Sequence, residues 1–260
     1  MKIALISLSN EGARVAARLA DHFPQSEIFL HAGVESLSAA KRFERVVELT
    51  AEIFSQVDGL IYVAPAGLVV RAIAPCVKHK ATDPAVVVVD VGARWAVSLL
   101  GGHEGGANDL AMAVANCLGA EPVISTTTEA MKDLIVGVGC RRNTPAEAIV
   151  GAVRETLLQV GADLARVRLL ASADIKADEP GLLEAARQLG LPLRLVAAEE
   201  IAQTTRAFQH SEFVQAKVDL PAVAEPAALL AGRRTQLLLP KTILNGVTVA
   251  IAREGFSPSA

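Results

Sequence analysis

One short segment of the chain combines several glycines with two side chains that can exchange protons. Residues 98–109 read SLLGGHEGGAND, so His103 and Glu104 stand between two glycine pairs, directly before a helical pattern. Glycine permits positive φ angles and lets the backbone approach a ligand closely. The amides of such a loop, together with the start of a helix, can receive an anion. An imidazole titrates near neutral pH, so we predict that His103, assisted by Glu104, performs acid–base catalysis.

The same loop supplies the first group of predicted substrate contacts. The alternative is a turn whose glycines serve only the backbone geometry, with His103 a solvated loop residue. Four glycines around a His-Glu pair, after an apolar segment, favour the functional interpretation. The substrate-binding residues predicted here are Gly101, Gly102, Gly105, Gly106 and Asn108.

Two charged residues in the first half of the chain interrupt or end apolar segments. Arg71 lies in GLVVRAIAP (67–75), where it could clamp a carboxylate or simply extend along an apolar surface to water. Asp90 ends the run AVVVVD (85–90), where it could take part in catalysis, cap a helix or form a turn. We predict both as substrate-binding residues.

The second half contains VGVGCRRNT (136–144), a glycine-containing turn with two arginines. Its glycines match part of a dinucleotide-binding fingerprint, but Arg142 stands where the third glycine is required. Nucleotide binding is therefore the least favoured interpretation, and the arginines suit carboxylates better. Cys140 is either a thiol of lowered pKa or a small buried residue. Lys176 and Glu179 follow another apolar run and could bind substrate or pair with neighbouring charges. The substrate-binding residues predicted in this half are Cys140, Arg141, Arg142, Thr144, Lys176 and Glu179.

These residues need a scaffold that brings the ends of several strands together. The first half alternates aliphatic runs with helical patterns, which predicts a mostly parallel sheet with helices on both faces. In such sheets ligands bind beyond the carboxyl ends of the strands, where we predict the candidate residues to lie. The predicted strands are 2–8, 27–30, 59–65, 85–90 and 95–100, and the predicted helices are 11–22, 38–54, 68–74 and 108–118.

The second half restarts the same alternation after a polar segment. Residues 125–133 are polar and aperiodic, which predicts a linker at 128–133 between an amino-terminal domain, 1–127, and a carboxy-terminal domain, 134–260. Thr144 as N-cap and Pro145 in the first turn mark the start of one helix, and Gly190 marks the end of another. We therefore predict an α/β fold of two small three-layer domains with mostly parallel sheets. The predicted strands here are 134–139, 166–172, 191–197, 236–240 and 247–252, and the predicted helices are 145–160, 180–190, 198–205 and 224–232.

The composition of the 260 residues limits the classes of function. Aromatic residues make up only 3% of the chain and the net charge is −3, which together disfavour a nucleic-acid partner. The three separated cysteines fit a reducing cytoplasm better than a disulfide framework. Neither a signal peptide nor a membrane-spanning run is indicated. Zinc, EF-hand, Walker and serine-nucleophile motifs are missing from the sequence, which disfavours the commonest hydrolase and ATPase classes.

Taken together, these strings resemble the CbiG family of cobalamin biosynthesis, the cobalt-precorrin-5A hydrolases. The amino-terminal matches are APAGLVVRAIAP, PAVVVVD and SLLGGHEGGAND, and the carboxy-terminal matches include VGVGCRRNTPAEAI, LASADIKADEPGLLEAA and VAEPAALLAG. The carboxy-terminal set is also similar to the CobE proteins. Many family members carry a further segment between the two modules, which this chain lacks. A short form of this kind could bind its substrate differently or need a partner chain.

The resemblance implies a hydrolase acting on a carbon–carbon bond of cobalt-precorrin-5A. The reaction opens a δ-lactone of the macrocycle and releases acetaldehyde, giving cobalt-precorrin-5B in anaerobic cobalamin biosynthesis. Cobalt would arrive inside the substrate, so we expect no cofactor and no metal ligands in the protein. The expected partners are this substrate and other enzymes of the pathway, in the cytoplasm, with no nucleic acid and no membrane. The alternative is a non-catalytic carrier protein that binds corrinoid intermediates of the same pathway.

Overall fold

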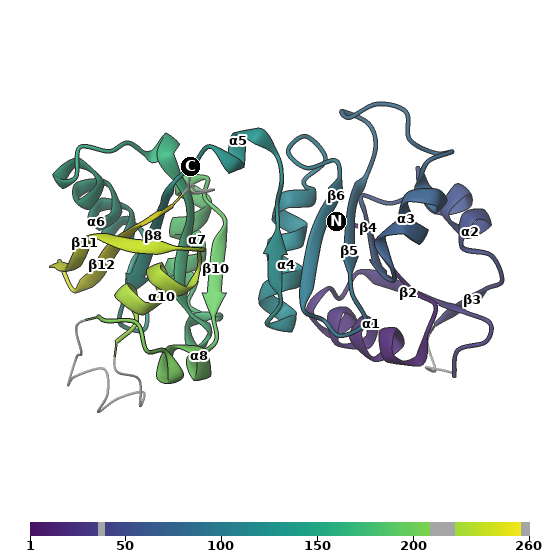
Figure 1. The fold of residues 1–260 in the computed structure, drawn as a ribbon, viewed down its shortest axis with the longest axis horizontal. Coiled ribbons are helices and arrows are strands. Elements are labelled where there is room, and N and C mark those ends of the chain that lie inside the picture. The colour runs from purple at the N-terminus through teal and green to yellow at the C-terminus, as the bar shows by residue number, and fades with distance from the viewer. Residues whose placement is uncertain (36–39, 209–221, 256–260) are drawn as a thin grey trace. The chain divides into compact units, whose positions relative to one another are not determined.

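The computed structural model describes residues 1–35, 40–208 and 222–255, which form two compact units, Met1–Thr126 and Thr127–Ala260. Each unit is built on one sheet whose strands are mostly parallel, with helices packed against it (Figure 1). The predicted fold class, two α/β domains with mostly parallel sheets, is confirmed. In the described parts of the chain, no helix combines the length and the apolar character that crossing a bilayer requires.

The N-terminal unit is a sheet covered by helices on both faces. Its elements are β1 (Ile3–Ser7), α1 (Asn10–His22), β2 (Ser26–His31), β3 (Lys41–Phe43), α2 (Val46–Ile53), β4 (Gly59–Val63), α3 (Ala66–Ile73), β5 (Ala85–Val89), β6 (Trp95–Leu100), α4 (Ala107–Leu118) and β7 (Glu121–Val123). Among the described residues the strand order is β3-β2-β1-β4-β5-β6-β7. Helices α1 and α4 pack on one face, and α2 and α3 pack on the other. Because both faces are covered, β1, β4 and β5 are buried along their whole length, as their aliphatic runs predict.

The direction of β6 separates two groups of residues that we expected at one edge of this sheet. Strands β1, β4 and β5 are parallel, but β6 runs antiparallel to β5, so that Leu100 at its end pairs with Val86 near the start of β5. The loop after β6 therefore lies at the edge where the parallel strands begin. The prediction that this loop shares the carboxyl edge with Arg71 and Asp90 is wrong, because an aliphatic run does not reveal the direction of its strand.

The predicted helix 38–54 is also wrong in its first half. Residues 38 and 39 lie outside the described part of the chain, and the next residues form the edge strand β3. Its Phe43 is buried in the core between α2 and α3 and the sheet. The helix begins only at Val46, after Arg45 in extended conformation. The spacing of charged residues in this segment resembled that of an amphipathic helix. Pairing with β2 instead places residues 41–43 in a strand.

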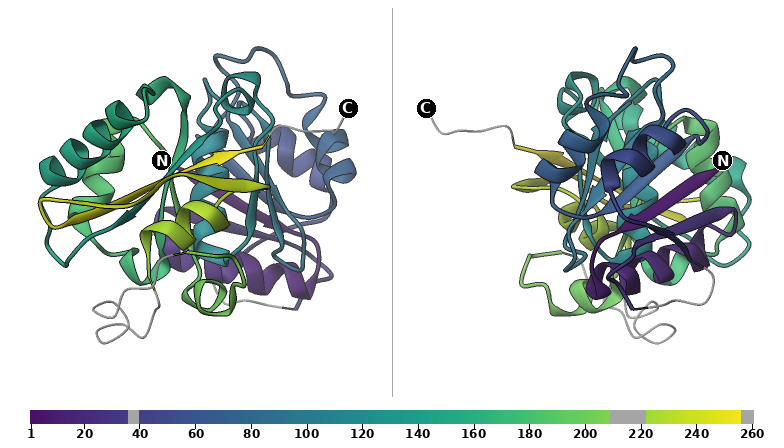
Figure 2. Two further views of the ribbon diagram at one scale, coloured as in Figure 1. Left: turned by 60° about the vertical axis from the view of Figure 1, so that its left-hand side comes forward. Right: turned by 90° about the vertical axis from the view of Figure 1, so that its right-hand side faces the viewer.

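The C-terminal unit repeats the layered plan with a smaller sheet. Its elements are α5 (Thr127–Ala130), β8 (Leu134–Gly139), α6 (Ala146–Gln159), η1 (Leu164–Arg166), β9 (Val167–Ala173), η2 (Asp174–Lys176), α7 (Pro180–Leu189), β10 (Leu193–Val196), α8 (Ala198–Gln203), α10 (Ala224–Leu230), β11 (Thr235–Leu244) and β12 (Val247–Glu254). Within the described residues the strand order is β10-β9-β8-β12-β11. Strands β8, β9 and β10 are parallel, whereas β12 runs antiparallel to both of its neighbours. Figure 2 shows the β11–β12 pair in yellow with the yellow-green α10 beside it.

Strand β8 is packed differently on its two faces. Val136 and Val138 point into the core formed with α6 and α7. Gly137 points to the opposite face, where a Cβ atom would lie 1.9 Å from the carbonyl oxygen of Ala224. The start of α10 thus rests directly on the backbone of β8. Alternation of valine and glycine along one strand is what permits a thick helical layer on one face and backbone contact on the other.

We predict that Gly137→Ala destabilises the protein by about 3 kcal/mol, because the new methyl group would force α10 away from β8. The matched control is Gly151→Ala in α6, where a Cβ atom would meet nothing within 4 Å. This control should gain about 1 kcal/mol from helix propensity. Urea denaturation followed by circular dichroism measures both. Equal stability of the two variants would show that α10 does not depend on this contact.

Candidate functional site

The glycines of the loop Gly101–Gly106 are required by its backbone. Gly101 and Gly106 have φ angles of +72° and +79°, a region that side chains disfavour. A Cβ atom on Gly105 would lie 2.9 Å from the carbonyl oxygen of Gly101. The N–H groups of Ala107 and Asn108, in the first turn of α4, donate to the carbonyls of Gly101 and Gly102 at 3.0 Å. These two amides, which we predicted as part of an anion site, are therefore already engaged within the loop.

His103 and Glu104 are both exposed, and they do not form a pair. The Glu104 carboxylate accepts a hydrogen bond from Lys80 at 2.6 Å. That hydrogen bond, followed by one from its own backbone and by the charge of Lys80, lowers the pKa of Glu104. Among the described residues, none hydrogen-bonds the His103 imidazole. The loop thus presents an accessible imidazole, while Glu104 is an ionised partner of Lys80 and does not orient His103.

The side chain of Asn108 is committed to the fold. It is buried, and its carbonyl oxygen accepts from the Ser98 hydroxyl at 2.8 Å while its amide donates to Thr126 at 3.1 Å. These bonds join the end of β6 to the end of the N-terminal unit across the base of the glycine loop. Asn108, which we predicted to bind substrate, therefore stabilises the loop through these hydrogen bonds.

The opposite edge of the same sheet holds Arg71 and Asp90. Strand order reverses between β1 and β4, and open α/β sheets bind ligands beyond the carboxyl ends of the strands at such a reversal. Arg71, in α3 just after β4, is exposed and donates to the carbonyl of Gly67 at 3.2 Å. A guanidinium at this place is open to a ligand.

Asp90 forms a turn, which is one of the roles that its sequence position suggested. Its carboxylate accepts from the backbone N–H groups of Arg94 and Trp95, at 2.8 and 2.9 Å, and from the Arg94 side chain at 3.0 Å. Partial burial raises the pKa of Asp90, but these hydrogen bonds outweigh it, so the net pKa lies below its usual value. Asp90 is thus a fixed carboxylate that shapes the β5–β6 turn.

In the C-terminal unit the structure brings most of the predicted residues together. Strands β8 and β9 are parallel, so the turn Cys140–Thr144 and the segment after β9 meet at one edge. Glu179 is 2% exposed, accepts the backbone N–H of Asn143 at 2.7 Å, and lies 3.9 Å from Lys176. The buried carboxylate of Glu179 therefore stabilises the turn, in which Asn143 has a φ of +61°. Lys176 is mostly buried beside it.

The remaining residues of the turn differ in their surroundings. Burial raises the pKa of Cys140, and the charge of Lys176 only partly opposes this effect, so Cys140 is a neutral thiol at neutral pH. Arg142 forms an exposed ion pair with Asp178 at 3.3 Å. The predicted N-cap is wrong by one residue: Pro145 is the N-cap of α6, and the Thr144 hydroxyl instead donates to the carbonyl of Arg141. A proline cap with no side-chain hydrogen bond is tolerated because its φ suits a helix start.

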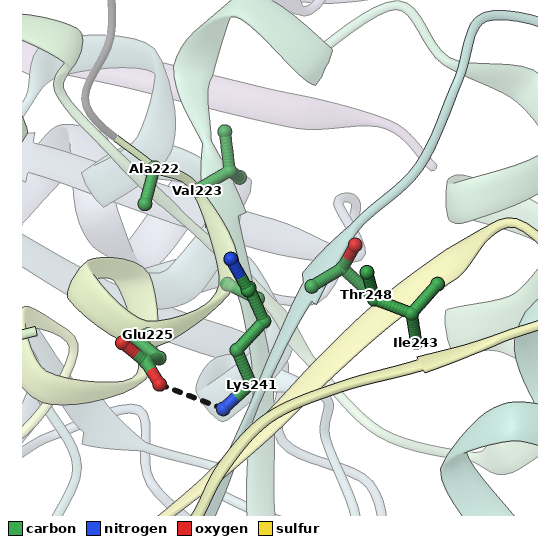
Figure 3. A pocket seen from close by; sticks show the side chains of 7 residues that line it. Ala222, Val223, Glu225, Lys241, Ile243 and Thr248 are labelled. Carbon is green, nitrogen blue, oxygen red and sulfur yellow. Dashed lines mark hydrogen bonds between the residues drawn. The ribbon is translucent and has the colours of Figure 1, made fainter. Parts of the chain in front are cut away.

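A cavity next to this turn is lined by residues that no motif of the sequence indicated. It is lined by Ala222, Val223, Ala224, Glu225, Lys241, Ile243 and Thr248 (Figure 3). Glu225 is 1% exposed and accepts the backbone N–H of Lys241 at 2.6 Å. The signal for Glu225 was present in the sequence, since it is the one charged residue in VAEPAALLAG. A lone carboxylate in an apolar run implies a specific buried partner.

The structure assigns no metal site to the described residues. Within the parts of the chain that it describes, no group of three or more His, Cys, Asp or Glu side chains could hold a metal ion together. The C-terminal edge carries ammonium and guanidinium groups, a thiol, hydroxyls and the exposed carboxylate of Asp178, which pairs with Arg142. Guanidinium and ammonium groups are the side chains that bind carboxylates and phosphates.

Comparison with known proteins matches both halves of the chain to one family. The model for the cobalamin synthesis G N-terminal region matches residues 48–129, and the model for the cobalamin synthesis G C-terminus matches residues 134–252. A cobalt-precorrin-5A hydrolase of Priestia megaterium is 25% identical over 352 residues, covering 96% of this chain and 94% of the relative. Protein CobE of Sinorhizobium sp. is 37% identical over 128 residues, covering 48% of this chain and 83% of the relative.

A solved structure of a putative cobalamin biosynthesis protein G homolog from Sulfolobus solfataricus is also similar. It is 20% identical, with 98% of this chain and 97% of that chain covered, and a TM-score of 0.39.

We predict that Cys140 reacts slowly with iodoacetamide at neutral pH, because its raised pKa leaves little thiolate. Its labelling should be at least about tenfold slower in the folded protein than in urea, and should accelerate as the pH rises. Peptide mass spectrometry resolves Cys140 from the other two cysteines. Labelling in the folded state as fast as in urea would contradict the burial of this thiol.

Proposed function

The chain belongs to the CbiG family of cobalamin synthesis proteins, and from this we propose that it is a cobalt-precorrin-5A hydrolase. The proposed reaction opens the δ-lactone of the macrocycle and releases acetaldehyde. The observation that carries the proposal is the match of both family models, in order, with only residues 130–133 between them. A relative named for this activity aligns over 96% of the chain.

The proposed chemistry requires a base and stabilisation of a developing oxyanion. Attack of water on a lactone needs proton removal, and the later cleavage of a carbon–carbon bond needs further proton transfer. We assign these proton transfers to His103, whose imidazole is exposed on the glycine loop. The ion pair of Glu104 with Lys80 keeps that carboxylate charged, so Glu104 supports the loop electrostatically in this proposal. Cobalt belongs to the substrate, and no step is assigned to a metal held by the chain.

Binding of the macrocycle is assigned to cationic residues. The substrate carries acetate and propionate arms, and guanidinium groups bind carboxylates in a bidentate manner. Arg71 at the carboxyl edge of the N-terminal sheet is exposed, as are Arg141 and Arg142 at the turn after β8. Lys176, beside Glu179, is less exposed and contributes charge to the same turn.

A second candidate function is a non-catalytic carrier for corrinoid intermediates of the same pathway. One observation, the length of the hydrolase of Priestia megaterium, favours it. The alignment with that hydrolase spans 352 positions, whereas this chain has 260 residues, so the relative carries residues without a counterpart here.

We expect the purified protein to release one acetaldehyde for each cobalt-precorrin-5A consumed. A coupled alcohol dehydrogenase assay follows the acetaldehyde, and the absorption spectrum follows the macrocycle. The control is the same incubation with heat-inactivated protein. Tight binding of the macrocycle without acetaldehyde would support the carrier function and reject the hydrolase.

His103→Ala should lower kcat by about 10²- to 10⁴-fold, because the proposed acid–base group is removed. The substrate dissociation constant and the thermal unfolding midpoint should change little, since the side chain is exposed. His22→Ala, at the exposed end of α1, removes an imidazole far from the loop in sequence and should leave kcat unchanged. Full activity of the His103 variant would reject the assignment of this residue.

A further inference from the structure

We propose that the cavity beside the carboxyl end of β8 is a subsite for a carboxylate, with the ammonium of Lys241 as its anchor. The cavity lies between the start of α10 and strands β11 and β12. Gly139, the last residue of β8, lies next to two of the lining residues: a Cβ atom there would be 3.5 Å from Val223 and 3.7 Å from Thr248. In the order β10-β9-β8-β12-β11, later strands lie on both sides of β8. Open α/β sheets bind ligands at the carboxyl end of a strand placed in this way.

A break in the β11–β12 ladder directs Lys241 toward this cavity. The register shifts between Leu239 and Thr242, so that Pro240 and Lys241 have no partner residue in β12. Bulges of this kind redirect a side chain and are common beside functional sites. The backbone N–H that the ladder leaves unused donates to the buried carboxylate of Glu225 at 2.6 Å. Glu225 is therefore a positioning residue for Lys241.

The groups that face the cavity favour an anion. Figure 3 shows the Lys241 side chain extending away from Glu225 toward Val223, with the Thr248 side chain across from it. No carboxylate among the described residues forms an ion pair with the Lys241 ammonium. The Glu225 carboxylate is 1% exposed, so an entering ligand meets the ammonium and the Thr248 hydroxyl before it meets this negative charge. An ammonium and a hydroxyl together can donate several hydrogen bonds to one carboxylate.

The size and the rim of the cavity indicate which part of a molecule enters it. Its volume is about 60 Å³, far below the roughly 300–1,000 Å³ of pockets that enclose a whole small ligand. The cavity therefore takes a terminal group, and the rest of the ligand stays outside. Ile243 lines the mouth and is 65% exposed, which offers an apolar contact to the body of that ligand. A carboxylate on a short hydrocarbon arm meets both requirements.

This subsite deepens the proposed function, on which its assignment to a substrate arm rests. A macrocycle with acetate and propionate arms carries the terminal group that the cavity selects. Lys241 and Thr248 would hold one such arm beside Cys140 and Arg141, at the turn that follows β8. The substrate-binding edge would thus extend from this turn to the β11–β12 pair.

The test titrates propionate, and separately inorganic phosphate, into ¹⁵N-labelled protein. We expect propionate to shift the amide signals of Gly139 and Thr248, and Lys241→Met to abolish these shifts. Arg154→Met, which removes an exposed charge from α6 in the same unit, is the matched control and should preserve them. Shifts that persist in the Lys241 variant, that are missing from the wild type, or that phosphate produces equally would overturn the proposal.

A second binding experiment connects the subsite to the substrate arms without turnover. Cobyrinic acid carries carboxylate arms, and cobinamide carries amides in their place. Lys241→Met should weaken the binding of cobyrinic acid by about tenfold and leave that of cobinamide unchanged. Equal weakening for both, or no binding of cobyrinic acid by the wild type, would overturn the assignment to a substrate arm. Because no catalysis is measured, the subsite can hold even if the acetaldehyde assay rejects the hydrolase.

Variants of Glu225 test its role as a positioning residue. Glu225→Gln keeps an oxygen that can accept the Lys241 N–H and should retain the affinity for cobyrinic acid. Glu225→Ala leaves that N–H without its acceptor, so the affinity should fall by about three- to tenfold. Circular dichroism confirms that both variants fold. Normal affinity of a folded Glu225→Ala variant would show that the bulge holds Lys241 without help.

Discussion

The contact between the backbones of α10 and β8 determines how the C-terminal unit is built. Gly137 leaves no room for a side chain between the strand and the carbonyl of Ala224. Because the helix start is held at this distance, Val223 and Glu225 are fixed with respect to the end of β8. Glu225 in turn holds the bulge that carries Lys241. One missing side chain thus sets the position of a carboxylate, of a strand irregularity and of an ammonium group.

The direction of a strand is a comparable constraint in the N-terminal unit. The loop Gly101–Gly106 follows a strand that runs against its neighbour, so it lies at the edge opposite to Arg71. A ligand at the carboxyl edge of the parallel strands meets Arg71, whereas a ligand at the other edge meets His103. His103, the proposed acid–base residue, and the Arg71 guanidinium therefore cannot contact the same small group. For this unit, a binding role at one edge and a catalytic role at the other are separate hypotheses.

The sequence was sufficient where a local pattern decides the structure. Four valines before Asp90 predicted a buried strand, and Gly190 ends α7 in the left-handed conformation that glycine adopts at low cost. It was insufficient where a distant partner decides. The direction of β6 and the short strand β3 depend on neighbouring strands. The link between Glu225 and Lys241 joins residues that no short motif contains, so the cavity they line was missed.

In the C-terminal unit, two buried carboxylates hold backbone groups next to cationic side chains. Glu179 accepts the backbone N–H of Asn143, and Glu225 accepts that of Lys241. Each carboxylate is almost fully removed from solvent and accepts a hydrogen bond from the backbone N–H that it positions. The positive groups on the same segments, including Arg142 and Lys241, are by contrast left within reach of solvent. Burial and hydrogen bonding to the backbone reduce the repulsion that Glu179 and Glu225 would exert on an anionic ligand near these segments.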